Sequence, residues 1–162
     1  DACGRAGLEL SALSSETLEK LGPFIPPTGS VSNPVDVTFA KDPSAFFTHI
    51  PGILLEEKNA DILMVYLLSP PRVVERILKG MGLPHEEVKV QGRKIIALHA
   101  EQFARLLKTQ GKPIIGFSFH RPDAHVIGEM TARGVPVFQG AERAARAVAA
   151  LVAYAGVRGR ET

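Results

Sequence analysis

Excess charge of one sign, cysteine pairs, tryptophan and long apolar runs are all missing from this chain of 162 residues. The 19 Lys and Arg residues nearly balance the 17 Asp and Glu residues, and a net charge of +2 is too small to indicate a phosphate-backbone partner. The longest apolar runs, residues 62–68 and 114–119, fall far short of the roughly 20 residues that cross a bilayer. The sequence therefore predicts neither nucleic-acid binding nor a membrane span.

The only cysteine is Cys3, which excludes an internal disulfide. No charged segment followed by an apolar one opens the chain, so we expect a reducing, cytoplasmic setting with Cys3 as a structural thiol. The chain begins with Asp1 instead of Met, from which we expect a fragment of a longer protein. With 45% apolar and 22% charged residues, the composition is that of one soluble globular domain.

Strand and helix patterns alternate along the chain. The uninterrupted apolar runs at residues 62–68 and 114–119 are typical of strands buried on both faces of a parallel sheet. Shorter strands are expected at residues 32–39 and 135–138. Helices are expected at residues 14–21, 43–58, 72–81, 99–109, 124–133 and 141–154, with a kink at Pro51, whereas residues 82–97 are typical of either a hairpin or a loop.

This alternation predicts a parallel sheet with helices on both faces, the doubly wound α/β class. Ligands of such sheets collect outside the carboxyl ends of the strands. In this chain those ends are residues 36–39, 68–71 and 119–123. We therefore expect functional side chains at the ends of these three segments.

Residues 120–125 place two imidazoles, a guanidinium and a carboxylate directly after a buried strand. His120, Arg121 and His125 could contact an anion or a metal, or the segment is a solvated loop in which Asp123 caps the next helix. A metal site needs three or four converging ligands, and Pro122 separates the two histidines, so we expect no metal here.

The segment Asn33-Pro34-Val35-Asp36 puts two hydrogen-bonding side chains around a rigid X-Pro step. Such a step either fixes the entry of a strand or presents polar groups at the rim of an active site. No glycine-rich phosphate loop, paired-carboxylate motif or Ser/His/Asp arrangement accompanies it. The chemistry of the residues alone does not name a function.

Segments at both ends of the chain resemble the NDP-forming acyl-CoA synthetases, including the ADP-forming acetate–CoA ligases. The resemblance implies a flavodoxin-like, three-layer α/β/α domain over residues 1–156, with a tail at residues 157–162. The domain is similar to the carboxyl-terminal domain of the succinyl-CoA synthetase β-subunit. The matching segments are Asp1-Ala2-Cys3, Gly7-Leu8-Glu9-Leu10, Leu13-Ser14-Ser15-Glu16-Thr17-Leu18, Pro26-Pro27, Asn33-Pro34-Val35-Asp36, Gly134-Val135-Pro136-Val137-Phe138, Glu142-Arg143-Ala144-Ala145-Arg146-Ala147 and Tyr154.

In that family, acid, CoA and ATP become acyl-CoA, ADP and phosphate through a phosphorylated histidine in a Ser-His-Thr-Gly segment of another domain. None of the five histidines here lies in such a segment, so the resemblance implies an isolated chain without activity. It also implies a first strand and a glycine-rich turn before Asp1. The implied partners are CoA-binding, phosphohistidine and ATP-grasp domains, with CoA, ATP or ADP and Mg bound by the intact enzyme and no cofactor bound by this domain alone. A homo-oligomer is left open.

The resemblance further implies that Asn33 and Asp36 stand at the carboxyl edge of the sheet, beside the phosphohistidine or acyl site. With Ser69, His120 and Arg121, they form the predicted rim of the active site, and no catalytic residue is expected in this chain. One alternative is a non-catalytic binding or regulatory module of the same fold, for example fused to an acetyltransferase. A flavodoxin is another alternative, but it needs aromatic residues around the flavin, and the chain has no Trp and only two Tyr.

Overall fold

A computed structural model describes residues 1–38, 42–67, 71–119 and 125–158. The predicted strands at residues 62–68 and 114–119 are present as β1 and β2, and the predicted strand at 135–138 is present as β3. In chain order the elements are α1 (Ala2–Arg5), α2 (Ser15–Leu21), the 3₁₀ helices η1 (Gly22–Phe24) and η2 (Pro43–Phe46), α3 (His49–Glu56), β1 (Leu63–Tyr66), α4 (Pro71–Gly80), α5 (His85–Gln110), β2 (Ile114–Ser118), α6 (His125–Ala132), β3 (Val137–Gln139) and α7 (Ala141–Arg158).

The three strands form one parallel sheet in the order β1-β2-β3. Leu63 lies opposite Ile114, and Gly116 lies opposite Val137. Residues that lie opposite one another point to the same face of the sheet, and successive residues of each strand point to alternate faces. The strand β3 lies at the edge of the described sheet. A proline is tolerated next to an edge strand because the outer side of that strand donates no backbone hydrogen bond to a neighbouring strand. Pro136 still accepts a hydrogen bond, from the Gly116 amide at 2.9 Å.

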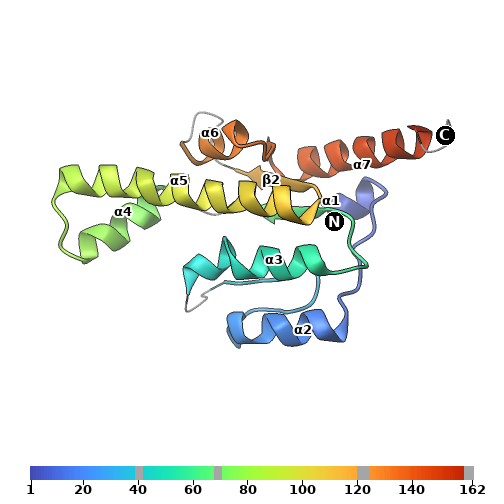
Figure 1. Ribbon diagram of the computed structural model, residues 1–162, viewed down its shortest axis with the longest axis horizontal. Helices are drawn as coiled ribbons and strands as arrows, with labels where there is room; N and C mark the ends of the chain where they lie inside the picture. The colour runs from blue at the N-terminus through green and yellow to red at the C-terminus, as the bar shows by residue number, and fades with distance from the viewer. Residues whose placement is uncertain (39–41, 68–70, 120–124, 159–162) are drawn as a thin grey trace.

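One face of the sheet is covered by α3, α5 and α6. Strand residues such as Val65 and Ile114 pack there against Leu55 of α3, Phe103 of α5 and Met130 of α6, and all five side chains are buried. Figure 1 shows α5 running along the molecule, with α3 beside it and α2 beside α3. Both crossovers, from β1 to β2 and from β2 to β3, thus place helices on this face.

The opposite face is covered by α7 and by the short helix α1. Ile115 packs with Ala144 and Val148 of α7, and Met64 and Phe138 are partly buried in the same cluster. The Cys3 thiol lies 3.7 Å from the Met64 sulfur, which places α1 over β1. Helices therefore cover both faces of a parallel sheet, and the predicted α/β class in three layers is confirmed.

A separate apolar cluster lies between α2, α3 and the loop that joins them. Leu21, Ala45 and Ile50 form its buried centre. Val31, Val35 and Val37 of the loop pack against it and are partly buried. The α2 helix is as predicted, because Ser14 is its N-cap and accepts a hydrogen bond from the Thr17 amide.

The strand predicted at residues 32–39 is wrong for the described residues 32–38. Instead, Ser30 and Asp36 form an isolated antiparallel bridge, with reciprocal amide-to-carbonyl hydrogen bonds of 3.0 and 2.8 Å. The Asn33–Pro34 peptide bond inside this bridge is cis. The alternating valines that suggested a strand bury one side of a loop on α2 and α3 instead of joining the sheet.

The single helix predicted at residues 43–58 is divided into η2 and α3. Thr48, between them, has φ −122° and ψ −81°, which lies outside the helical region. Since α3 begins only at His49, Pro51 lies in its first turn, where no backbone donor is required. The expected kink at Pro51 in mid-helix is therefore wrong.

Residues 82–97, expected as a hairpin or loop, mostly belong to α5. This helix has 26 residues and begins 14 residues before the predicted start at His99. Its buried positions Val88, Gly92, Ile96 and Ala100 recur every four residues, the spacing of a helix face. Gly92 lies beside α4, where a Cβ would be in ordinary van der Waals contact with a Val74 methyl group at 3.9 Å, so the packing does not require glycine.

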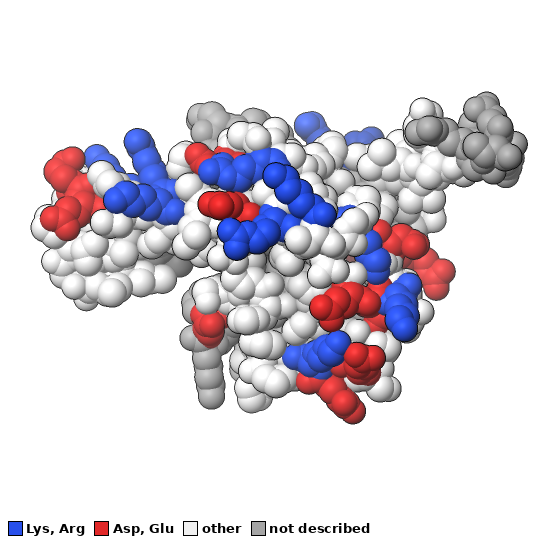
Figure 2. All heavy atoms as spheres, in the orientation of Figure 1, with Lys and Arg blue, Asp and Glu red and all other residues white. Residues whose placement is uncertain are grey.

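The last helix, α7, continues to Arg158, beyond the predicted end at Tyr154. Figure 2 shows acidic and basic side chains both along α5 and over α2 and α3, with basic ones more numerous along α5. Among the described residues, no helix combines the length and the apolar character needed to cross a bilayer.

Candidate functional site

The carboxyl edge of the sheet carries three aromatic side chains. The rings of Tyr66 and Phe117 are stacked with centroids 5.3 Å apart, and Phe119 meets Tyr66 edge-on at 5.6 Å. Phe119 is 68% exposed. Behind it, the Gly140 amide donates to the Ser118 carbonyl at 3.0 Å and starts α7 close to the end of β2. The edge therefore offers an apolar, aromatic surface at the place where parallel sheets bind ligands.

Three helices begin at this edge, because α4, α6 and α7 follow β1, β2 and β3 along the chain. Helix amino ends favour anionic groups. In α7 the first turn contains Glu142, whose carboxylate lies 3.6 Å from the Arg5 guanidinium. The predicted rim residues Ser69, His120 and Arg121 lie outside the described residues.

Asn33 and Asp36 lie in the bridged loop and not at the end of a strand. The Asn33 side-chain amide donates to the Ser11 carbonyl at 3.0 Å, across 22 residues of sequence. Asn33 is exposed. The loop is thus tied by Asn33 to the connection between α1 and α2.

Asp36 organises its own turn. One carboxylate oxygen accepts hydrogen bonds from the Thr38 amide at 2.8 Å and from the Thr38 hydroxyl at 2.5 Å. These bonds favour the ionised form and hold the pKa of Asp36 below its ordinary value. An exposed carboxylate of this kind can accept hydrogen bonds or balance a cation, but its geometry does not mark it as a nucleophile.

Asp42 repeats the arrangement of Asp36 six residues later. Its carboxylate accepts from the Ser44 amide at 2.9 Å and from the Ser44 hydroxyl at 2.6 Å, and the pKa of Asp42 is lowered for the same reason. Asp42 lies outside the Asn-Pro-Val-Asp segment. It therefore provides an internal comparison for Asp36.

Gly29 closes the loop by an unusually near approach of two backbone segments. A Cβ at this position would lie 2.3 Å from the Asp36 carbonyl oxygen and 2.9 Å from a methyl group of Ile25. Only glycine fits without a shift of the backbone. The position of Asp36 thus depends on the absence of a side chain at residue 29.

The buried carboxylate of Glu57 is a feature that the sequence did not reveal. Glu57 is 2% exposed, and its two oxygens accept from the Ser14 amide at 2.7 Å and from the Asn59 amide at 3.0 Å. These two backbone donors, followed by the Thr17 hydroxyl, lower the pKa of Glu57 to about 2. The main donor is 43 residues away in sequence, so no local motif could have signalled it.

Glu57 and Asn59 together hold the connection between α1 and α2. The Asn59 side chain donates to the Ala12 carbonyl at 3.3 Å, while Glu57 holds the Ser14 amide. The same connection accepts the hydrogen bond from Asn33 at Ser11. The segment 11–14 is therefore held on one side by the turn before β1 and on the other by the loop that contains Asn33 and Asp36.

Four histidines of the described part of the chain lie on the helices that cover the sheet, namely His49 on α3, His85 and His99 on α5, and His125 on α6. His99 of α5 stacks on Phe47 with centroids 3.9 Å apart, and burial lowers the pKa of His99. His125 lies 3.9 Å from Glu129, which also forms an ion pair with Arg133 one turn further on. Within the described ranges, no three His, Cys, Asp or Glu side chains are arranged to hold a metal ion.

The chain is similar to known CoA ligases. The Ligase-CoA domain family matches residues 1–97, more than half of the chain. Acetate–CoA ligase (ADP-forming) II subunit alpha of Pyrococcus furiosus is 28% identical over 158 residues, covering 96% of this chain and 30% of that protein. Acetate–CoA ligase (ADP-forming) I of Archaeoglobus fulgidus is 26% identical over 174 residues, covering 86% of this chain and 25% of that protein.

A solved structure shares the fold. The PH0766 protein of Pyrococcus horikoshii superposes with a TM-score of 0.66 over 94% of this chain and 31% of its own, at 24% sequence identity. The chain thus spans about a third or less of the relatives that it matches. The family match includes α2, the Asn33–Asp36 loop, α3 and β1. The chain belongs to the Ligase-CoA domain family and, through it, to the NDP-forming acyl-CoA synthetases.

Proposed function

We propose that this chain serves as one domain of an ADP-forming acyl-CoA synthetase, which converts acid, CoA and ATP into acyl-CoA, ADP and phosphate. The observation that carries the proposal is the family match over residues 1–97, supported by two relatives that are both named ADP-forming acetate–CoA ligases. In this proposal the phosphohistidine and the sites for CoA, nucleotide and Mg belong to other domains of the enzyme, which is consistent with the chain spanning only 30% and 25% of these relatives.

In this proposal the Asn33–Asp36 loop borders the site at which the phosphohistidine domain docks. Three properties of the loop support this role. Both side chains are exposed, the Asp36 carboxylate stays ionised, and the loop is anchored at Gly29, Ser11 and Thr38. A fixed, exposed pair of polar groups can orient a partner at little entropic cost. Ser69, His120 and Arg121 complete the proposed rim.

The test is Asp36→Asn in the intact enzyme that carries this chain, with Asp42→Asn as the matched control. The two carboxylates accept the same pair of hydrogen bonds from the residue two positions on. We expect both variants to change the melting temperature similarly. Only Asp36→Asn should lower turnover, by about tenfold, which corresponds to roughly 1.4 kcal/mol in the barrier.

The opposite result assigns the loop a structural role. If Asp36→Asn and Asp42→Asn melt early and retain full turnover per folded molecule, the Asp36 carboxylate only closes its turn. The alternative function, a non-catalytic module of the same fold, is favoured by the fact that both described hydrogen bonds to this carboxylate come from Thr38 of the same turn. A parent reading frame without Ser-His-Thr-Gly and ATP-grasp segments would support that alternative.

A further inference from the structure

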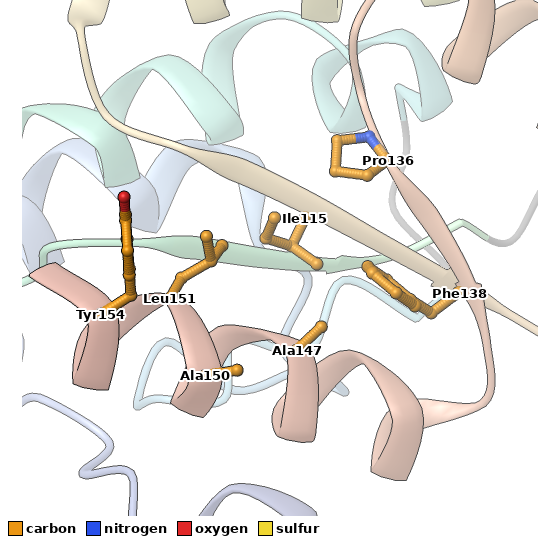
Figure 3. A pocket seen from close by; sticks show the side chains of 7 residues that line it. All are labelled: Ile115, Pro136, Phe138, Ala147, Ala150, Leu151 and Tyr154. Atoms are coloured by element: carbon orange, nitrogen blue, oxygen red, sulfur yellow. The ribbon is translucent and has the colours of Figure 1, made fainter.

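Two hollows of the described surface differ in the groups that line them. The larger, of about 460 Å³, lies between α7 and the sheet. Figure 3 shows its lining side chains, with Leu151 and Tyr154 on α7 and Ile115 and Phe138 on the strands. None of its lining residues is charged, so this hollow does not distinguish one apolar partner from another. The smaller hollow is lined by a carboxylate as well as by apolar side chains and is therefore more selective.

The smaller hollow lies where η1 and the proline-rich segment after it meet the start of η2. Its lining includes Phe24, Ile25 and Pro26 from the first of these segments and Asp42 and Ala45 from the second. Its volume is about 150 Å³. Pockets for small molecules begin at roughly 300 Å³. The hollow therefore has room for a single side chain and not for a nucleotide.

The apolar part of this hollow is held in place by the rest of the fold. The Phe24 ring stacks on His49 of α3, with centroids 5.1 Å apart and ring planes 15° apart. Phe24 and Ile25 also pack against the apolar cluster around Leu21 and Ile50. Both side chains remain half-buried. Covering them with a hydrocarbon chain would remove apolar surface from water, which is favourable.

The carboxylate of Asp42 supplies the charge. Its Oδ1 atom accepts hydrogen bonds from the Ser44 amide at 2.9 Å and the Ser44 hydroxyl at 2.6 Å, and these bonds hold the pKa of Asp42 below its ordinary value. The described hydrogen bonds do not use Oδ2, and Asp42 forms no ion pair with another described residue. The hollow thus presents an ionised carboxylate with one oxygen open to a cationic donor.

We propose that this hollow binds a lysine side chain of another polypeptide chain, with the ammonium group at Asp42 and the aliphatic stem along Phe24 and Pro26. Lysine combines a point charge with an apolar stem, which matches the two kinds of surface in the hollow. Arginine fits less well, because its planar fork pairs best with both oxygens of a carboxylate and Oδ1 already has two donors. Since Asp42 and Pro23 are exposed, another chain can reach the hollow. The inference concerns binding and does not depend on the proposed function.

The test is an NMR titration of the isotopically labelled 162-residue chain with Nα-acetyl-lysine methylamide. The backbone amide signals of Ile25 and Ala45 report on the hollow, which both residues line. The norleucine derivative has a similar apolar stem without the charge, and the arginine derivative carries its charge in a planar fork. We expect saturable shifts with the lysine derivative in the millimolar range, weaker binding of the arginine derivative and no binding of the norleucine derivative.

Asp42→Asn and Asp36→Asn are the matched variants for this titration. Both carboxylates accept the same pair of hydrogen bonds, but only Asp42 lines the hollow. Because a hydrogen bond to a charged group is lost, Asp42→Asn should weaken binding of the lysine derivative about tenfold, and Asp36→Asn should leave it unchanged. Ser44→Ala removes one donor from Oδ1, so the preference for lysine over arginine should shrink.

Several results would overturn the proposal. Undiminished binding to Asp42→Asn, or equal binding of the norleucine derivative, would show that the hollow does not recognise charge. An arginine derivative that binds as tightly as the lysine derivative would overturn the choice of lysine. Binding of n-butylammonium without binding of the lysine derivative would assign the hollow to free amines instead of another chain. Should Asp42→Asn fail to fold, Ser44→Ala decides, because an unchanged preference for lysine would contradict the role of Oδ1.

Discussion

At the scale of single residues, Glu57 is the most firmly held acidic group described. A buried carboxylate is stable only when hydrogen bonds replace its lost hydration, and two backbone amides and the Thr17 hydroxyl do so here. The carboxylate also satisfies the amide of Ser14, the N-cap of α2. Glu57 therefore joins the start of α2 to the turn before β1 and indirectly holds the Asn33 loop.

This arrangement predicts how stability depends on pH. Since the pKa of Glu57 is lowered from 4.5 to about 2, ionised Glu57 stabilises the fold fully above pH 4.5, and this contribution is lost as the pH falls through 2. In Glu57→Gln the neutral amide resembles the protonated acid. We expect its melting temperature to lie below that of the unmodified chain at pH 7 and to approach it near pH 2.

Glu56→Gln is the control for this measurement. Glu56 is exposed and pairs with Lys20 at 3.3 Å on the surface. Its removal should shift the melting temperature little at any pH, because exposed ion pairs are largely screened by solvent. A deficit of Glu57→Gln that is as large at pH 2 as at pH 7 would show that packing, and not ionisation, is responsible.

At the scale of the elements, the sheet depends on a glycine in its central strand. A Cβ at Gly116 would lie 2.8 Å from a methyl group of Leu67 and 3.2 Å from one of Val137, on the face covered by α5. Gly116→Ala should therefore overpack the core and lower the free energy of unfolding by about 1–3 kcal/mol. Chemical denaturation measures this loss.

A double-mutant cycle identifies the cause. Leu67→Ala alone should cost about 2–5 kcal/mol, because Leu67 is 1% exposed. It also empties the space that the new methyl group needs. We therefore expect Gly116→Ala to cost clearly less in the Leu67→Ala background, and equal costs in both backgrounds would argue against contact between the two side chains.

The helices and strands differ in how far the sequence predicted them. β1 and β2 were evident because strands buried on both faces need an unbroken apolar run. α5 was missed over residues 85–97, where Val88, Ile95 and Ile96 favour strands locally. Packing against α4 overrides that local preference, since Val88 and Ile96 fall on one buried helix face.

At the scale of the whole molecule, the chain is a domain whose matched relatives are more than three times its length. We predict that the isolated chain shows no ATP-dependent formation of acyl-CoA above the uncatalysed rate. None of its five histidines lies in the Ser-His-Thr-Gly segment that the family resemblance requires. Purified chain assayed with acetate, CoA and Mg-ATP provides the measurement.

The intact parent enzyme, assayed in the same buffer, is the positive control. Steady turnover by the isolated chain that persists through further purification would contradict the assignment of the chemistry to other domains. Loss of turnover on addition of a chelator to the intact enzyme would be consistent with a requirement for Mg there.

The sequence by itself determined the α/β class, the strands β1 and β2, the helix α2 and the family, because these depend on local periodicity and short motifs. It singled out Asn33 and Asp36 by the same means. Only the tertiary structure decided that their segment is a bridged loop, that residues 85–97 are helical and that Glu57 is buried and ionised. Those outcomes depend on contacts between segments far apart in sequence, such as Ser14 with Glu57, Asn33 with Ser11 and α4 with α5, which no local pattern records.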